Sequence, residues 1–438
     1  MMNLYGLDVK ITPEEKPVLI EINGRNSGTD GFVLVYGDVR TQEEILLKMA
    51  NKAGENGIYT TYTTTNSLTD LPHLLYGTLL WFKEIKRIRS KYKGCSPQID
   101  WFIDHKPRLP EFSERRPRQY FVEASEKLNL DLFTCSSMIY DGKNALRVEY
   151  PRRIKKGHRG KERIRPDEVG LVWPIKSIYT QRTRKNEQMF FGPTDFDEKL
   201  VNPFPIQNFL RTKPYLHELF RETEFSDFLP QSELFGAGLT RDNYDFIETS
   251  KFVKKPSTYS QGYGVQIFPQ RILRKLLENS SPKEENKRIM DMFKEAIIKR
   301  DYESIHVLID FLKFCSSLIQ EFVPSKPIHS DVTGKDHDGC MRAIVVDGKF
   351  VDAYWRLSPE PLDGYESIEN LRRKYGANLE QGAIPQQISE SDLEIVRPFT
   401  EKLVKALEER INMYSIKNFN KWRIFELAYW ARKLREAG

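Results

Sequence analysis

Two apolar runs near the start of the chain, residues 6–11 and 18–22, flank a polar segment at 12–17 that contains two prolines. Short apolar runs on either side of such a turn predict a β-hairpin. Apolar positions then recur at helical spacing in residues 41–53, and residues 71–92 are apolar first and basic at their end. We therefore expect a hairpin, a helix and a helix-rich connector, in this order.

From residue 118 the pattern is typical of mixed helices and strands, with a helix at 119–128 and strands at 132–139 and 169–175. The C-terminal half continues in the same way and contains no fixed-period repeat. It predicts helices at 209–221, at 303–315 and from Ser391 onward, and strands at 233–238, 252–256, 265–268, 317–323, 342–346 and 350–356. We expect an α/β (α+β) fold.

The composition is that of a soluble globular protein, because 39% of the residues are hydrophobic and 30% are charged. The 438 residues predict two or three compact units. No run approaches the roughly 20 apolar residues of a membrane span, and residues 1–10 lack a secretory pattern. We therefore expect a cytoplasmic protein without membrane contact.

Cysteine spacing and charge narrow the chemistry only a little. The four cysteines form no CxxC pair, so neither a zinc site nor a disulfide framework is indicated; they are Cys95, Cys135, Cys315 and Cys340. The net charge of +6, from 68 basic and 62 acidic residues, suits anionic small molecules. A basic loop at 152–165 could contact phosphate, but no aromatic side chains interleave its charges, so we expect no nucleic-acid partner.

One lysine-rich strand is followed by glycines that suit a phosphate loop. Lys254 and Lys255 end the apolar strand at 252–256, and Gly262 and Gly264 follow in a polar loop. Glycine allows the backbone to approach a phosphate group closely. The segment is not a Walker A motif, and taken alone it is equally compatible with an ordinary glycine turn.

Two further strands carry polar groups at useful positions. The run Gln320, Glu321, Phe322 and Val323 is an apolar strand with a polar end, suited to lying under a flat ring. The hairpin that follows begins with Arg342, and its returning strand carries Arg356. Arginine presents a planar fork that matches a carboxylate or a phosphate group.

The candidate metal ligands lie in the N-terminal hairpin. Asp8 and Glu21 can face each other across its two strands, and Asn23 points in the same direction as Glu21. Carboxylate and amide oxygens are ligands that suit Mg²⁺. Because Glu21 interrupts an apolar run, a chance acid on a solvent-facing hairpin is the weaker interpretation.

In this order, the motifs resemble the ATP-grasp superfamily, whose members have a lysine and glycine loop, a QEF(I/V) hinge strand, an arginine hairpin, an N…GA segment and a metal pair in GxD…(L/I)EIN. The resemblance implies phosphate contacts from Lys213 and Lys255 and a glycine lid at Gly262 and Gly264. It places adenine beside Gln320, Glu321, Phe322 and Val323, with Asn378 in the N…GA segment. It assigns Mg²⁺ to Asp8, Glu21 and Asn23, and the charge of an acyl phosphate to Arg342 and Arg25.

The order of the motifs departs from the family, because the metal pair opens the chain instead of following the N…GA segment. One account is a circularly permuted domain. The other is a truncated tandem, in which residues 1–55 are the remnant of an upstream unit and residues 424–428 form a degenerate second metal strand with Glu426 as its ligand. The sequence leaves both accounts open.

The resemblance then implies a hairpin and helix at 1–55, a helical connector at 56–115, a pre-ATP-grasp α/β domain at 116–245 and an ATP-grasp domain at 246–438. It implies a ligase that uses ATP and Mg²⁺ to activate a carboxylate as an acyl phosphate for attack by an amine or similar nucleophile. Its partners would be these small-molecule or peptide substrates, and self-association into a homo-oligomer is left open. The alternative is a catalytically inactive nucleotide-binding or scaffold protein.

Overall fold

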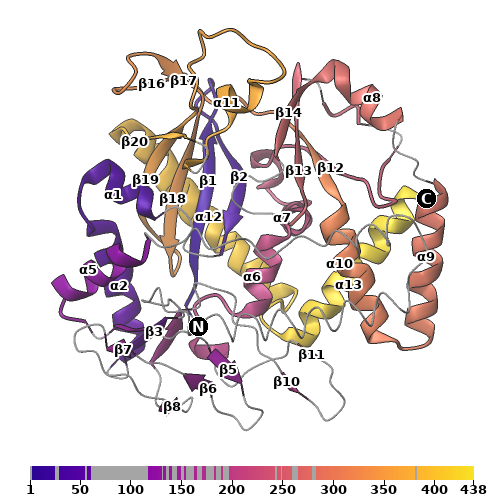
Figure 1. The fold of residues 1–438 in the computed structure, drawn as a ribbon, viewed down its shortest axis with the longest axis horizontal. Helices are drawn as coiled ribbons and strands as arrows, with labels where there is room; N and C mark the ends of the chain where they lie inside the picture. Colours follow the sequence, from indigo (N-terminus) through magenta and orange to yellow (C-terminus); the bar gives the residue numbers. More distant parts are fainter. Residues whose placement is uncertain are drawn as a thin grey trace, which may run out of the picture.

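The computed structural model describes residues 2–24, 29–54, 57–60, 117–130, 197–241, 244–247, 249–258, 265–278, 283–379 and 382–438, and short segments between 132 and 190. Its described residues form a five-stranded sheet and a neighbouring four-stranded sheet, with helices around both (Figure 1). Helices and antiparallel sheets occur together, so the expected α+β class is confirmed.

The five-stranded sheet joins the two ends of the chain. Its order is β2-β1-β18-β19-β20, and all its strands are antiparallel to their neighbours. Its strands are β1 (Leu4–Ile11), β2 (Pro17–Asn23), β18 (Gly339–Val346), β19 (Lys349–Leu357) and β20 (Ile384–Gln387). Both predicted hairpins are confirmed, and the second turns at Asp347 and Gly348, whose positive φ angles of 52° and 76° fit a type I′ turn.

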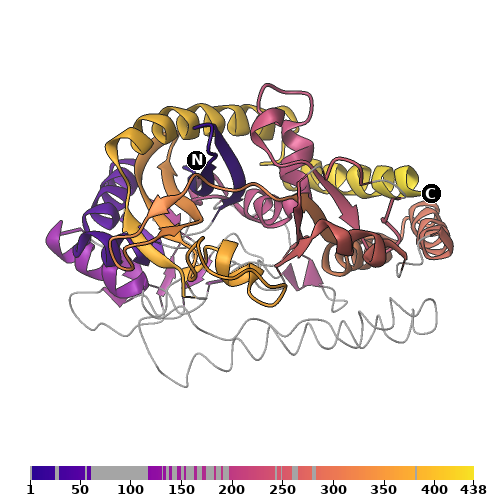
Figure 2. The ribbon, with the colours of Figure 1, turned by 90° about the horizontal axis from the view of Figure 1, so that it is seen from above.

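The two faces of this sheet differ in polarity. On one face Tyr5, Leu7 and Val9 of β1 are fully buried in the main hydrophobic core. Helix α12 (Glu390–Met413) covers this face and runs across the molecule (Figure 2). Because side chains alternate along a strand, Asp8 and Lys10 lie on the opposite face.

Part of that opposite face is apolar, where two N-terminal helices pack on it. Helices α1 (Asp30–Tyr36) and α2 (Arg40–Ala53) contact β19, and Phe32 meets the ring of Tyr354 edge to face at 4.7 Å. Helix α2 also packs against α5 (Pro117–Lys127). A mixed sheet lies beside them, with the order β7 (Arg152–Arg153), β4 (Leu132–Thr134), β3 (Ile58–Thr60) and β9 (Leu171–Trp173).

The smaller sheet has the order β12 (Ser232–Phe235), β15 (Ser317–Glu321), β13 (Lys251–Pro256) and β14 (Gln266–Pro269). One face buries Phe252 and Ile319 against Leu273 of α8 (Leu273–Glu278). The other face carries Lys255, in register with Leu318.

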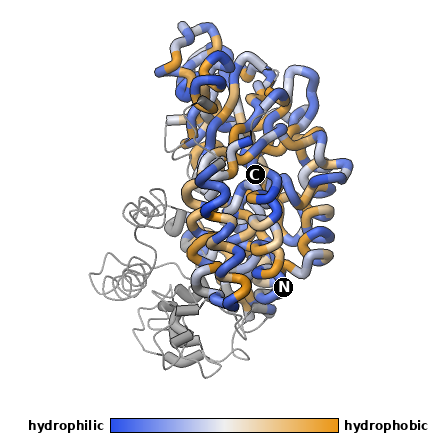
Figure 3. The backbone as a smooth tube through the Cα atoms, turned by 90° about the vertical axis from the view of Figure 1, so that its right-hand side faces the viewer, coloured by the Kyte–Doolittle hydropathy of each residue, from blue (hydrophilic) through white to orange (hydrophobic). Residues whose placement is uncertain are grey.

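The remaining helices surround this sheet and the main core. They are α6 (Phe204–Arg211), α7 (Lys213–Phe220), α9 (Lys283–Ile298), α10 (Tyr302–Cys315), α11 (Leu371–Tyr375) and α13 (Phe419–Ala437). Hydrophobic and hydrophilic stretches alternate along the helical turns in Figure 3, as expected for amphipathic helices that cover a core. The other described strands are β5 (Met138–Tyr140), β6 (Leu146–Val148), β8 (Glu162–Ile164), β10 (Arg182–Thr183), β11 (Met189–Phe190), β16 (Ile328–His329) and β17 (Asp336–His337).

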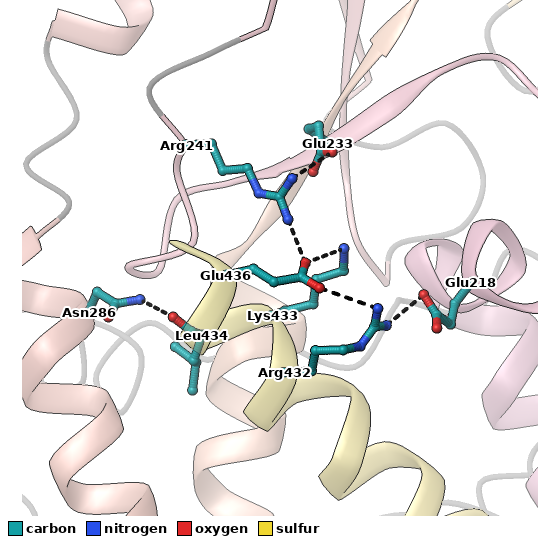
Figure 4. Close-up of polar contacts among 8 residues, drawn as sticks. All are labelled: Glu218, Glu233, Arg241, Asn286, Arg432, Lys433, Leu434 and Glu436. Atoms are coloured by element: carbon teal, nitrogen blue, oxygen red, sulfur yellow. Dashed lines mark hydrogen bonds and ion pairs between the residues drawn. The ribbon is translucent and has the colours of Figure 1, made fainter. Parts of the chain in front are cut away.

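Polar contacts hold the end of α13 against the smaller sheet and α7. Arg241 bridges Glu436 of α13 to Glu233 of β12, and Arg432 of α13 pairs with Glu218 of α7 (Figure 4). The last turns of the chain are therefore attached to two elements that precede them by about two hundred residues in sequence.

Four sequence predictions need correction. The helix expected at 209–221 is two helices, because the chain breaks at Thr212 before Pro214, a residue favoured in a first helical turn. The strand expected at 132–139 divides between β4 and β5, which belong to different sheets. The basic loop at 152–165 contains the short strands β7 and β8. Residues 424–428 are not a strand but lie inside α13.

Glu426 has a structural environment within the helices. Its side chain is fully buried, pairs with Lys313 of α10 and accepts a 3.0 Å hydrogen bond from the Tyr215 hydroxyl. Arg423 lies 3.3 Å from its other oxygen. Removing one partner of a buried ion pair leaves an uncompensated charge, so this cluster holds α13 against α10 and α7.

We expect Lys313→Met to lower the free energy of unfolding by about 3–5 kcal/mol, because it leaves Glu426 buried without its closest cation. Adding Glu426→Leu should recover part of that loss. Lys402→Met removes a lysine from an exposed pair with Glu224 and should cost no more than about 1 kcal/mol. Urea unfolding measures all three. Equal losses for Lys313→Met and Lys402→Met would contradict the structural role of the buried pair.

Candidate functional site

Lys255 is the central residue of the candidate site. It is only 4% exposed, and it points from β13 of the smaller sheet toward the larger one, where its Nζ lies 3.4 Å from the carbonyl oxygen of Ile20 on β2. Its neighbour Lys254 points the other way and lies 5.1 Å from the ring centre of Phe235. The two adjacent lysines therefore have different surroundings, as strand alternation predicts.

The surroundings of Lys255 disfavour its charged form. Burial lowers its pKa from the ordinary value of 10.5 to about 8; Lys213 adds to this fall, and the charges of Glu21 and Asp8 oppose it. In the described residues no carboxylate lies within ion-pair distance of the Lys255 amine. A buried cation with this environment gains most from an added anion.

Lys213 lies beside this lysine because two elements meet there. It is buried, and it begins α7, whose first backbone N–H donates a 2.8 Å hydrogen bond to the Ser257 carbonyl just after β13. The N-terminus of a helix carries a partial positive charge, which adds to the charge of Lys213. The arrangement gathers positive charge at one end of the smaller sheet.

Gln320 of the predicted base-binding strand lies on the same face of the smaller sheet as Lys255. Gln320 is buried next to Val253 in the register, and its side-chain Nε2 donates no hydrogen bond within the described structure. Phe322 is buried and meets the ring of Tyr375 at 5.1 Å. The Glu321 backbone N–H donates to the Gln231 carbonyl. A buried amide donor without an acceptor suits a polar ligand at this place.

On the larger sheet, two arginines share one carboxylate. Arg342 Nε and Arg356 Nη2 lie 2.9 Å and 2.7 Å from Asp8 Oδ1, and all three residues are buried. The short distance to Arg342 is possible because Gly6 has no side chain; a Cβ there would come within 2.8 Å of Arg342 Nη1. Burial alone would lower the pKa of Arg356, but the aspartate raises it, so this guanidinium group remains charged.

Glu21 is the register partner of Asp8 and is half-buried, and Asn23 faces Gly6 two pairs further along the hairpin. Glu21 and Asn23 therefore lie on the side of β2 that also carries the interaction with Lys255. Among the described residues, no group of three or more His, Cys, Asp or Glu side chains could hold a metal ion.

Sequence reasoning missed a buried ion pair that connects the larger sheet to the segment following β15. Lys10 Nζ of β1 lies 2.6 Å from Asp338 Oδ2 and donates a 2.9 Å hydrogen bond to the Val323 carbonyl. Asp338 also accepts from the Ser325 backbone N–H at 2.9 Å. The spacing of Asp8 and Lys10, two residues apart on a predicted strand, could have indicated it, because this spacing places both side chains on one face.

Some predicted site residues stay untested. Arg25, Gly262 and Gly264 lie outside the described residues. For Asn378, the described contact is its carbonyl oxygen, which accepts from the Ala383 N–H and closes the turn before β20. Its role toward a nucleotide stays a prediction.

The position of the hairpin bears on the two accounts of chain order. The permuted account expects Glu21 beside Lys255, whereas the truncated tandem expects a distant hairpin and Glu426 on a strand. The hairpin pairs with β18 and contacts Lys255, and Glu426 lies in α13. This is the arrangement expected for the permuted order.

Comparisons with known proteins do not identify a family. No protein-family model matches the chain, and no curated protein matches it. The chain is similar to the crystal structure of a protein described as "Putative gamma-glutamylcysteine synthetase" from Methylobacillus flagellatus KT, with 9% identity and a TM-score of 0.39 over 99% of this chain and 90% of that chain. A similarity this weak supports no conclusion about the function of this chain. None of the described helices has the length and hydropathy needed to cross a membrane.

We expect the lowered pKa of Lys255 to appear in the pH dependence of stability. Between pH 8 and 10.5 an unfolded lysine keeps a proton that the folded protein has released, so this residue makes stability rise with pH across that window. The contribution should be about 1–3 kcal/mol.

Urea unfolding of the wild type and of Lys255→Met, at several values from pH 7 to 10, measures this contribution as a difference. The difference should change with pH, whereas the exposed-lysine control Lys402→Met should run parallel to the wild type. A constant difference for Lys255→Met would show that Lys255 has an ordinary pKa.

Proposed function

We propose that the protein is an ATP- and Mg²⁺-dependent ligase that activates a carboxylate as an acyl phosphate for attack by an amine or similar nucleophile. The observation that carries the proposal is Lys255, a buried lysine between two sheets that contacts a carbonyl oxygen and, among the described residues, has no carboxylate within ion-pair distance. Such a lysine suits the phosphate groups of a nucleotide, which would supply the missing negative charge.

The other residues on the same face fit the parts of a nucleotide. Lys213 would add a second cation to the phosphates, and Gln320 Nε2, which donates no hydrogen bond within the described structure, would serve the base beside Phe322. The Val323 carbonyl already accepts from Lys10, so the base would draw its backbone contacts from other atoms of this segment. Positioning and charge neutralisation are the contributions that phosphoryl transfer needs from a protein.

The residues present fit Mg²⁺ in part. Glu21 and Asn23 would hold the ion, which supplies charge neutralisation to phosphate oxygens and commonly keeps few protein ligands. Asp8 as a third ligand stays a prediction, because its carboxylate is shared between Arg342 and Arg356 in this structure. Arg342 would neutralise the acyl phosphate.

One observation favours the alternative, a nucleotide-binding protein without ligase activity. The described residues contain no cluster of three acidic, histidine or cysteine side chains for a metal, and Asp8 already has two cationic partners. Weak metal binding would leave nucleotide binding intact while turnover is lost.

We expect Lys255→Ala to weaken ATP binding by about tenfold or more, since it removes a buried cation from the phosphates. Lys254→Ala should change the affinity by less than about threefold, because Lys254 faces Phe235. Isothermal titration calorimetry with Mg-ATP gives both values. Equal effects from the two variants would remove the observation on which the proposal rests.

Turnover separates the ligase from the inactive alternative. Phosphate release from Mg-ATP should depend on an added carboxylate and an amine, and Glu21→Gln should reduce it by about a hundredfold or more while ATP binding changes little. The exposed-acid variant Glu14→Gln, on the same hairpin, should keep full activity. Binding of ATP by the wild type without any release of phosphate, over a broad set of carboxylates and amines, would favour the inactive alternative.

A further inference from the structure

The ion pairs of Asp8 with its two arginines are close but poorly directed. Asp8 Oδ1 lies within 2.9 Å of both guanidinium groups, but within the described structure neither contact has the geometry of a well-directed hydrogen bond. Its other oxygen accepts from Arg342 Nη2 at 3.4 Å, which is long for a charged pair. One carboxylate between two guanidinium groups leaves this trio with a surplus positive charge.

Arg356 is the less satisfied of the two arginines. Within the described structure its buried Nε donates no hydrogen bond, and its Nη2, which pairs with Asp8, donates to the Cys340 sulfur at 3.6 Å. Burial raises the pKa of the Cys340 thiol to about 11, so the sulfur is a neutral and weak acceptor at neutral pH. Because Arg356 is buried, its guanidinium group would gain from an acceptor with matching geometry.

We infer that Arg342 and Arg356 form a binding site for the substrate carboxylate, and that Asp8 occupies this site until the substrate displaces it. Asp8 shows which chemistry fits, because it is itself a carboxylate held between the two guanidinium groups. The inference deepens the proposed function and rests on it for the nature of the ligand, an organic carboxylate.

Asp8 is the most exposed member of the trio. Its side chain is 13% exposed, against 5% for Arg342 and 9% for Arg356, so a ligand that replaces Asp8 would meet both arginines. A displaced Asp8 stays beside its register partner Glu21. Substrate binding therefore exchanges one carboxylate for another. The apparent affinity is the intrinsic affinity multiplied by the fraction of sites that Asp8 leaves open.

The test compares Asp8→Asn with Glu14→Gln, which removes the same charge from the exposed turn of the same hairpin. The probe is succinate, added without nucleotide, and its binding is measured by isothermal titration calorimetry. Asp8→Asn should bind succinate about tenfold or more tightly than the wild type, because no internal carboxylate competes. Glu14→Gln should bind like the wild type, and Arg356→Met in the Asp8→Asn background should lose the gain.

Three results would overturn the inference: no gain in Asp8→Asn, a gain that survives Arg356→Met, or a larger gain for inorganic phosphate than for succinate. If Asp8→Asn does not fold, thermal unfolding of the wild type and Arg356→Met replaces the titration. Succinate must then raise the melting temperature of the wild type and have no effect on Arg356→Met.

ATP titrations on the same variants keep the two proposals apart. ATP binding that depends on Lys255, together with a failed succinate test, overturns only the carboxylate site. Succinate binding that depends on Arg356, in a protein that does not bind ATP, overturns the proposed ligase and leaves the carboxylate site standing.

Discussion

The pairing of β1 with β18 is the interaction on which the rest of the structure depends. It joins strands that are more than three hundred residues apart in sequence, and it places Asp8 directly opposite Arg342. Without it, the apolar face under α12 would lose Tyr5, Leu7 and Val9, and the polar face would lose the carboxylate between its arginines. One set of backbone hydrogen bonds thus builds both the core and the candidate site.

The candidate site follows from the way two sheets present unlike charges to each other. The smaller sheet supplies the buried Lys255, near Lys213 at the start of α7, and the larger sheet supplies Glu21 and Asp8. Lys10 and Asp338 connect the sheets through the Val323 carbonyl, at the segment that follows the predicted base-binding strand. Buried charges cost free energy unless they are paired or serve a ligand, so the concentration of cations here is the strongest physical sign of function.

Glu426 shows how a local motif misleads without its tertiary context. A run of apolar residues around one acid at 424–428 could be read as a strand with a metal ligand, because short apolar runs do not distinguish strands from buried helices. Within α13, the same glutamate lies fully buried beside Lys313 and Tyr215. The neighbouring helices, which the local sequence does not contain, determine its role.

The sequence by itself determined the local elements: the N-terminal hairpin, the turn at Asp347 and Gly348, and the opposite directions of Lys254 and Lys255. These follow from hydrophobic periodicity and backbone preferences, which act over a few residues. Only the tertiary structure decided that the hairpin joins β18, that Asp8 lies between Arg342 and Arg356, and that Lys10 reaches Asp338. Those contacts join residues far apart in the chain, and their partners are selected by packing and charge in the folded state, which a single sequence does not display.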